Sequence, residues 1–298
     1  MPQWLLWRLF CRLVGLLWFD STHTTKRTYP SLETYGATVN QIKAQVGGTV
    51  PIDELTSALK SKHYKLVTFT HVDTSTGVLS PAKLIAETVH SVSPGTLVIM
   101  DAVCSVASEE IQMDAWGLDV VLTASQKGLG APPGLSILLA SQKAIGVWEA
   151  RKAKGVREGS YYASWGKWLP IMKAYESGAA AYFATPPVNL IYAFKASLDL
   201  ITARAKSETG GSLPSLVERF ELHRKASQRI KSAAKALGLK SVPLQDSEAA
   251  NGMTALYFPP GVSASDLLPR LVGKGIVIAG GLHKEIKGEF AFACHLWS

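Results

Sequence analysis

Three polar segments follow apolar runs of the sequence at nearly equal intervals. Thr74 follows the first run, Asp101 the second and Lys127 the third, at intervals of 27 and 26 residues. Intervals of this length are typical of strand–helix units. Ligands of open α/β sheets bind at the carboxyl ends of the strands. We therefore predict that the three segments meet at one binding site.

Asp101 directly follows the apolar run Leu-Val-Ile-Met, so we expect its carboxyl group to be buried. A buried carboxyl group without a cation has a raised pKa, because the charged form is desolvated. A cation such as the protonated nitrogen of a pyridinium ring would remove that penalty. A helix cap or a structural ion pair would explain the same position.

Lys127 permits two interpretations of the same kind. An amine beside another cation becomes a usable nucleophile, whereas an ordinary lysine at a strand end simply reaches solvent. Gly128, Gly130 and Gly134 follow closely together with two prolines, which indicates a tight backbone around the lysine.

Other chemistry receives less support from the sequence. The hydroxyl run over 74–76 could donate to a phosphate or a phenolic oxygen, or could cap the following helix. His71 and His283 have no second ligand at metal-binding spacing, so no metal is expected. We find no glycine-rich dinucleotide fingerprint, phosphate-binding P-loop or nucleophile elbow.

The elements that would position these residues alternate between strands and helices. We predict helices over 52–59 and 81–90. We predict strands over 66–70, 97–100, 119–123 and 134–140. Short, continuously apolar strands are typical of buried parallel sheets. The pattern predicts an α/β fold, with a mainly parallel sheet and helices on both faces.

After Pro186 the pattern changes to that of a smaller α+β unit. We predict helices over 189–203 and 215–237, then short strands over 253–258 and 275–279. The inner positions expected for the long helix are Val217, Phe220, Ala226, Ile230 and Leu237. The chain therefore divides into an N-terminal stretch, a large domain and a small domain, predicted over 1–30, 31–204 and 205–298.

Composition limits the class of protein. Hydrophobic residues make up 47% and charged residues 18%, which indicates a folded core. The net charge is +8, but the basic residues are scattered, so nucleic acid is not an expected partner. The three cysteines lie far apart, which argues against a disulfide framework and favours a reducing compartment.

Residues 4–19 are almost wholly apolar, interrupted by Arg8 and Arg12. Sixteen residues are short for a membrane span, and arginine is costly inside one. No small-residue cleavage site of a signal peptide is evident. A packed terminal helix or a stretch outside the ancestral fold is the simpler interpretation, and no membrane is expected. An interfacial or targeting role stays open.

Four segments together resemble a known family. They are Thr-His-Val-Asp-Thr-Ser-Thr-Gly at 70–77, Met-Asp-Ala-Val-Cys-Ser at 100–105, Asp-Ala-Trp-Gly-Leu-Asp at 114–119 and Ser-Gln-Lys-Gly-Leu-Gly-Ala-Pro-Pro-Gly at 125–134. They resemble the alanine–glyoxylate and serine–pyruvate aminotransferases, class V members of the fold-type I pyridoxal-phosphate enzymes. The sequences of these segments most resemble those of fungal members, and the resemblance extends from about Ser31 to about Gly288.

The resemblance implies pyridoxal 5'-phosphate as the cofactor and a role for each matching residue. Lys127 would form the Schiff base with the cofactor and act as general base. Asp101 would pair with the pyridine nitrogen. Thr74 stands where the family places a hydroxyl near the ring oxygen, and Gln126 stands next to the phosphate.

The resemblance also implies the substrates and the assembly. Tyr182 and Thr185 match the segment that reaches the phosphate of the neighbouring subunit, so a homodimer with shared active sites is expected. The implied substrates are small amino acids and keto acids. The implied reaction transfers an amino group from alanine or serine to glyoxylate, giving glycine and a keto acid. Either the cytoplasm or the peroxisome is the expected location, without a convincing targeting signal.

The chain departs from the family pattern at both ends, which predicts a truncated chain. Residues 1–30 match neither the glycine-rich phosphate loop nor the ring-stacking aromatic residue of the family. After Gly288, no arginine stands where the family clamps the substrate carboxylate. The large domain would then be partial and the small domain incomplete.

Two alternative functions follow from these departures and from one cysteine. The first is a catalytically impaired or inactive chain that acts only as a dimerisation partner. The second is a class V desulfurase that uses Cys104, three residues after Asp101.

Overall fold

A computed structural model describes residues 16–20, 32–202, 214–286 and 288–294 of the chain. In chain order, the helices and strands are β1 (Leu16–Asp20), β2 (Val39–Lys43), α3 (Ile52–Ser61), β3 (Leu66–Thr70), α4 (Ala82–Val92), β4 (Leu97–Asp101), β5 (Val120–Ala124), β6 (Ser136–Ala140), α5 (Gln142–Ala153), α6 (Trp165–Glu176), α7 (Val188–Ile201), α8 (Leu216–Ala236), the 3₁₀ turn η2 (Asp246–Glu248), β7 (Met253–Tyr257), α9 (Ala264–Val272), β8 (Ala279–Gly280), the 3₁₀ turn η3 (Lys284–Ile286) and β9 (Phe290–Cys294).

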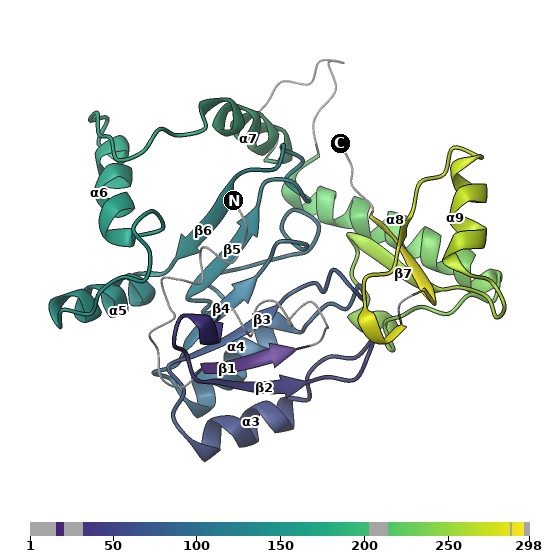
Figure 1. The fold of residues 1–298 in the computed structure, drawn as a ribbon, viewed down its shortest axis with the longest axis horizontal. Helices are drawn as coiled ribbons and strands as arrows, with labels where there is room; N and C mark the ends of the chain where they lie inside the picture. Colours follow the sequence, from purple (N-terminus) through teal and green to yellow (C-terminus); the bar gives the residue numbers. More distant parts are fainter. Residues whose placement is uncertain (1–15, 21–31, 203–213, 287, 295–298) are drawn as a thin grey trace.

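The centre of the fold is a six-stranded sheet with the order β2-β1-β3-β4-β5-β6 (Figure 1). Each neighbouring pair from β2 to β5 is parallel, and β6 pairs antiparallel with β5 at the edge. The predicted α/β fold with a mainly parallel sheet is confirmed.

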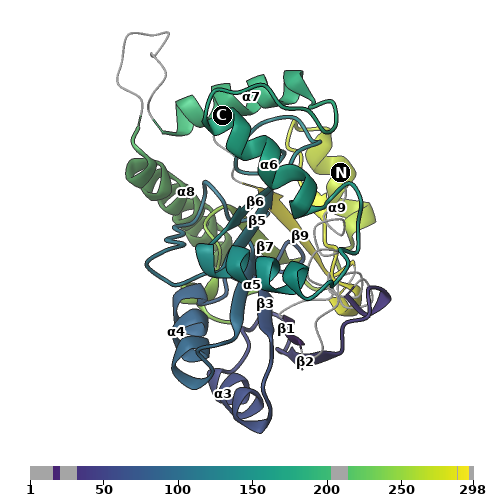
Figure 2. The same ribbon diagram turned by 90° about the vertical axis from the view of Figure 1, so that its left-hand side faces the viewer.

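Alternating side chains of the strands divide the core into two apolar layers. In β4, Val98 and Met100 pack in the layer under α3 and α4, whereas Leu97 and Ile99 pack in the layer that includes Ala144 of α5. Figure 2 shows α5 across the sheet from α4. Burial of each such side chain stabilises the fold by about 1.5–3 kcal/mol. Helices therefore cover both faces, as the apolar strands predict.

A smaller sheet of order β7-β9-β8, all antiparallel, lies beside α8 and α9 (Figure 1). A capping box of Ser215 and Glu218 begins α8. This unit contacts the loop after β3, since the amide of Leu79 donates to Glu248 at 2.7 Å and the amide of Ala250 donates to Gly77 at 2.9 Å. The smaller unit therefore closes over the carboxyl edge of the parallel strands.

The N-terminal stretch contributes a strand to the large sheet. β1 pairs in parallel with both β2 and β3, so residues 16–20 are not part of a terminal helix. Residues 1–15 lie outside the described part of the chain. None of the helices described is both long and apolar enough to cross a membrane. The three-part domain division stays a prediction.

The inner face predicted for the long helix α8 is wrong. Val217 and Leu237 are 76% and 78% exposed, and Ile230 is exposed as well. The buried positions are polar or small instead, with His223 and Ser227 fully covered. The reason is that α8 packs on main-chain carbonyl groups rather than on an apolar layer. Phe220 and Ala226, also predicted to face inward, are only partly buried.

Lys231 shows the polar packing of α8 most clearly. Its Nζ donates to the carbonyl oxygens of Ala249 and Ala250 at 3.1 and 2.8 Å. The strand predicted over 275–279 is also wrong in extent, because only Ala279–Gly280 pair with β9. Gly275 has a φ of +76°, a left-handed turn that follows α9 and delays the strand.

Candidate functional site

Asp101 lies at the carboxyl edge of the sheet, between two parallel neighbours. It is the register partner of Thr70 on β3 and of Leu122 on β5. The amide of His71 donates to the carbonyl oxygen of Asp101 at 2.8 Å, which continues the pairing by one residue. The backbone therefore fixes Asp101 where the chain leaves the sheet.

The carboxyl group of Asp101 is desolvated. Burial raises its pKa to about 6, although Oδ1 accepts a hydrogen bond of 3.0 Å from the amide of Val103. Among the described residues, no lysine or arginine lies within ion-pair distance of Asp101. The expected raised pKa is confirmed, whereas Asp101 is only partly buried. Such a group fits a protonated ring nitrogen, because that cation would restore the stability of the charged form.

The hydroxyl run after β3 divides into structural and exposed groups. The buried carboxylate of Asp73 accepts hydrogen bonds from the hydroxyls of Ser75 and Thr76. Thr74 is only partly buried, and its Oγ1 lies 2.8 Å from Sγ of Cys104. Ser75 and Thr76 therefore hold the loop and do not cap the following helix, because the N-cap of α4 is Pro81, without a side-chain cap hydrogen bond. Thr74 is the partly exposed hydroxyl of the run.

Lys127 lies in a tight loop after β5. The amide of Gly130 donates to the carbonyl oxygen of Lys127 at 2.9 Å, and Ser125 Oγ donates to that of Pro132 at 2.7 Å. Lys127 is partly buried, and Gln126 is exposed. The tight backbone predicted from the glycines and prolines is confirmed.

The Lys127 loop packs directly on the segment that follows Asp101. A Cβ placed on Gly128 would lie 2.2 Å from the carbonyl oxygen of Val106. Thr74 reaches the same segment through Cys104. The structure therefore brings together the three segments that carry Thr74, Asp101, Gln126 and Lys127, as the spacing predicts.

Tyr182 and Thr185 lie elsewhere, in the connection between α6 and α7 (Figure 1). The two side chains bond to each other at 2.8 Å and are both exposed. No hydrogen bond between described residues links them to Asp101 or Lys127. The position agrees with residues that serve a neighbouring subunit, and that role stays a prediction.

Sequence reasoning missed the role of His71 beside the site. Its ring lies edge-on to Trp116 with centroids 6.3 Å apart, and burial lowers its pKa to about 4. The imidazole is therefore neutral at physiological pH. Its position next to Asp101 could have been inferred, because His71 follows β3 and Asp101 ends the neighbouring strand β4.

Sequence reasoning also missed Glu109, which joins the two sheets. Its carboxylate accepts hydrogen bonds from Nδ2 of Asn251 at 2.8 Å and from the amide of Gly252 at 3.2 Å. Burial raises the pKa of Glu109, and these hydrogen bonds oppose the rise. The partners lie more than 140 residues away along the chain, so no local pattern indicates them.

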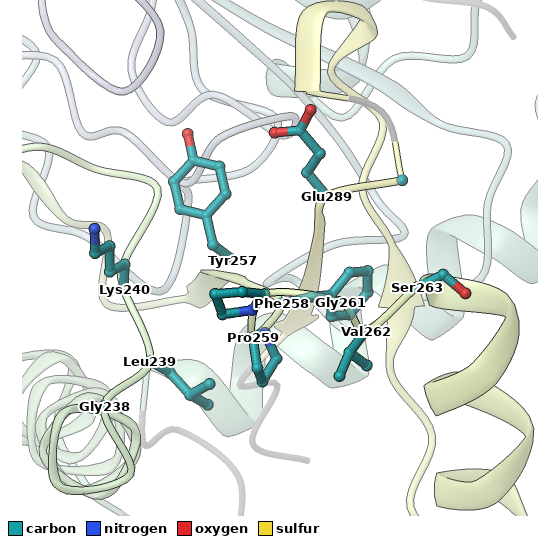
Figure 3. Close-up of a pocket in the computed structure, with 12 residues that line it drawn as sticks. Gly238, Leu239, Lys240, Tyr257, Phe258, Pro259, Gly261, Val262, Ser263 and Glu289 are labelled. Atoms are coloured by element: carbon teal, nitrogen blue, oxygen red, sulfur yellow. The ribbon is translucent and has the colours of Figure 1, made fainter.

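A cavity of about 580 Å³ lies in the smaller unit, away from these residues. Figure 3 shows Tyr257 and Glu289 pointing to the same side of it, above the strand end that leads to α9. Burial raises the pKa of Tyr257, and the negative charge of Glu289 adds to the rise. The cavity contains none of the candidate cofactor residues, so it is separate from the Asp101–Lys127 site.

Comparison with known proteins identifies the family. A model of the class-V aminotransferases matches residues 23–286. The chain belongs to the class-V aminotransferase family. The family match begins inside the stretch over 1–30 that the sequence motifs left unmatched.

Individual relatives agree with this assignment. Alanine–glyoxylate aminotransferase 1 of Saccharomyces cerevisiae is 41% identical over 89% of this chain and 66% of its own length. Serine–glyoxylate aminotransferase of Arabidopsis thaliana is 31% identical over 69% of this chain and 47% of its own length. The solved alanine–glyoxylate aminotransferase of a Nostoc species superposes with a TM-score of 0.83 at 25% identity, over 98% of this chain and 72% of that one. The chain thus spans about two thirds or less of the length of these two sequence relatives.

The family fixes the cofactor. Class-V aminotransferases use pyridoxal 5'-phosphate, so this is the cofactor of the family to which the chain belongs. The residues present fit its ring, since Asp101 is a desolvated acid that needs a cation and Thr74 is a partly exposed hydroxyl nearby. Asp101, Thr74 and Lys127 would hold the ring side of the cofactor, and Gln126 the phosphate side.

Proposed function

We propose that the protein transfers an amino group from alanine or serine to glyoxylate, giving glycine and a keto acid. The observation that carries the proposal is the desolvated carboxyl of Asp101 beside the Lys127 loop. The names of the yeast and plant relatives support glyoxylate as the acceptor. Alanine and serine are the donors that those relatives and the motif resemblance suggest.

Each residue of the site has a task that follows from its position. Bound pyridoxal phosphate supplies an electron sink for the bond electrons of the substrate Cα–H. Asp101 Oδ would hold the proton of the ring nitrogen, because burial disfavours the ionised acid unless a cation lies beside it. Lys127 Nζ would be the amine that holds the cofactor, and once free it would serve as the general base that takes the proton from the substrate Cα. Thr74 Oγ1 orients the ring through its hydroxyl.

The proposal is tested by steady-state kinetics of the chain loaded with pyridoxal phosphate. With alanine or serine varied against glyoxylate, reciprocal plots should give parallel lines, as expected for a ping-pong mechanism. Lys127→Ala should abolish turnover, while Lys152→Ala on the outer helix α5 should not. A transamination rate that survives Lys127→Ala would contradict the assignment.

A homodimer with shared sites is part of the proposal. Large apolar side chains are exposed along the α6–α7 region: Tyr161, Met172, Tyr175, Tyr182, Val188, Ile191 and Tyr192. An apolar surface of this extent is typical of a protein interface. Tyr182 and Thr185 lie within it, so dimerisation would carry them to the phosphate of the partner's cofactor.

Complementation between two defective variants tests the shared site. Lys127→Ala and the double variant Tyr182→Phe/Thr185→Val should each be impaired alone. In a mixed dimer, one site combines the native Lys127 of one subunit with the native Tyr182 and Thr185 of the other. Mixing should therefore restore turnover. Unchanged turnover in a mixture shown to contain heterodimers would contradict shared sites.

The same apolar surface supports a second candidate, a chain that only dimerises. It predicts a stable dimer, or a complex with a full-length relative, without turnover or bound pyridoxal phosphate. Ping-pong turnover by the isolated chain would exclude this candidate. The cytoplasm or the peroxisome remains the proposed location.

A further inference from the structure

Helix α8 brings an arginine from the predicted small domain to the Lys127 loop. Nε of Arg219 donates to the carbonyl oxygen of Ala107 at 3.2 Å, and Nη2 donates to that of Gly128 at 3.4 Å. One guanidinium therefore joins the segment that follows Asp101 to the segment that contains Lys127. Its planar fork suits two acceptors that are fixed relative to each other.

Both acceptors lie on backbone that has little freedom to adjust. Ala107 has a φ of +67°, a conformation that is unfavourable for an L-residue other than glycine. At Gly128, a Cβ would lie 2.2 Å from the carbonyl oxygen of Val106. The two segments thus touch through their main chains, and the strained backbone of Ala107 beside this contact persists only where surrounding groups hold it.

The guanidinium of Arg219 is partly desolvated, and this burial lowers its pKa. An arginine stays protonated even so. Charge-assisted hydrogen bonds are stronger than neutral ones, and a lower local dielectric strengthens them further. Arg219 is therefore suited to hold the strained backbone of Ala107 against the Lys127 loop.

The next carbonyl group along the chain, that of Leu129, is bound by a side chain of another helix. Ser197 Oγ on α7 donates to the carbonyl oxygen of Leu129. Two successive carbonyls after Lys127, those of Gly128 and Leu129, are thus bound by side chains of α8 and α7. The position of Lys127 relative to Asp101 depends on helices outside the sheet.

We propose that Arg219 is a positioning residue for Lys127, through which α8 sets the geometry between the lysine and Asp101. The inference rests on the proposed function for its catalytic meaning. The clamp itself is a property of the chain without cofactor. Arg219 would act through the two main-chain carbonyl groups that accept its hydrogen bonds.

Hydrogen–deuterium exchange of the cofactor-free chain tests the clamp. In Arg219→Met, exchange should accelerate about tenfold or more over residues 125–131 and 105–109 together, because a bond to a charged group is lost. These ranges contain the amides of Gly130 and Ala131 and those of Ser108 and Glu109, all of which donate within their own segments. Arg219→Lys keeps the positive charge but not the planar guanidinium with its two donors. The exchange rates of both segments in this variant should therefore lie between those of the unaltered chain and Arg219→Met.

Arg224→Met is the matched control, because Arg224 lies on the same helix and, among the described residues, pairs with Glu221 on that helix. It should leave exchange in both segments unchanged. Acceleration spread evenly over the whole chain in Arg219→Met would mean a general loss of stability, and no acceleration would mean no clamp. Either result overturns the proposal.

Two forms of the cofactor distinguish an effect on the position of Lys127 from a general effect on cofactor affinity. Pyridoxal phosphate bonds covalently to a lysine, whereas pyridoxamine phosphate cannot. Arg219→Met should weaken pyridoxal phosphate binding at least about tenfold more than pyridoxamine phosphate binding. Equal weakening of both forms would contradict a role in placing Lys127. If the unaltered chain binds neither form, the proposed function fails, while the exchange experiment still decides the clamp.

Discussion

Gly128 and Val106 meet at a point where no side chain fits between their backbones. A Cβ on Gly128 would lie 2.2 Å from the carbonyl oxygen of Val106, although the two residues belong to different strand–loop units. This contact sets how far Lys127 lies from the segment of Asp101. It explains why the chain needs glycine directly after the candidate lysine.

Gly128→Ala should therefore destabilise the chain by about 1–3 kcal/mol and weaken pyridoxal phosphate binding. Urea unfolding and cofactor titration measure the two effects. Gly146→Ala is the control, since that glycine lies in helix α5 with nothing within 4 Å of its would-be Cβ. Alanine there should stabilise the chain by roughly 0.5–1 kcal/mol. Equal stability of the two variants would contradict the close contact.

Asp101→Asn should make the cofactor-free chain more stable at pH 7, by about 1–3 kcal/mol, because it removes a desolvated charge. The same change should weaken pyridoxal phosphate binding by about 10- to 100-fold, since a charge-assisted contact is lost. Chemical unfolding and cofactor titration test both directions. Asp266→Asn should act oppositely on stability, because Asp266 belongs to the capping box that begins α9. A destabilised Asp101→Asn chain with unchanged cofactor affinity would contradict this account.

Asp101 and His71 should give the cofactor-free chain opposite pH dependences. Between about pH 4 and 6 the folded state holds a proton on Asp101 that the unfolded chain has lost, so this group makes stability fall as pH rises. Between about pH 4 and 6.5 the folded state lacks a proton on His71 that the unfolded chain holds, so this group makes stability rise with pH.

In the unaltered chain the two contributions oppose each other, so together they should change the urea midpoint of unfolding little between pH 4.5 and 6.5. In Asp101→Asn the midpoint should rise with pH, and in His71→Phe, which keeps an aromatic ring against Trp116, it should fall. The same slope in both variants would show that the two groups do not titrate as their burial indicates.

The apolar region over α6 and α7 should carry the dimer contact. Tyr192 is 70% exposed there, so Tyr192→Glu would place a charge in a buried interface and shift the protein toward monomers. Sedimentation velocity measures the change. Leu237→Glu at the end of α8 serves as control, because that side chain is 78% exposed but lies on the other unit. Dissociation of both variants into monomers, or of neither variant, would exclude this surface as the dimer interface.

The sequence predicts the sheet well where burial decides the pattern. The predicted strand over 66–70 is β3 to the residue, and the strand over 97–100 differs from β4 by one residue, because both are buried on both faces. Asp101 was expected to be desolvated for the same reason, and it is.

The sequence predicts poorly where long-range polar contacts decide the packing. Val217 and Leu237 fit an apolar helix stripe, yet α8 buries His223 and Ser227 instead, and Ser227 donates to the carbonyl oxygen of Ala250. Arg219 carries no local signal either, since its acceptors lie about ninety and more than a hundred residues earlier. The strand β1 within an apolar terminal stretch could not be distinguished from a helix, because its order in the sheet comes from distant neighbours.

The covalent attachment site of pyridoxal phosphate tests the central claim most directly. The chain is incubated with pyridoxal phosphate, reduced with borohydride and digested, and the modified lysine is identified by mass spectrometry. We predict one stoichiometric pyridoxyl group, on Lys127, and its loss in Lys127→Ala. Labelling of another lysine at equal yield, or no labelling above that of the denatured chain, would contradict the account.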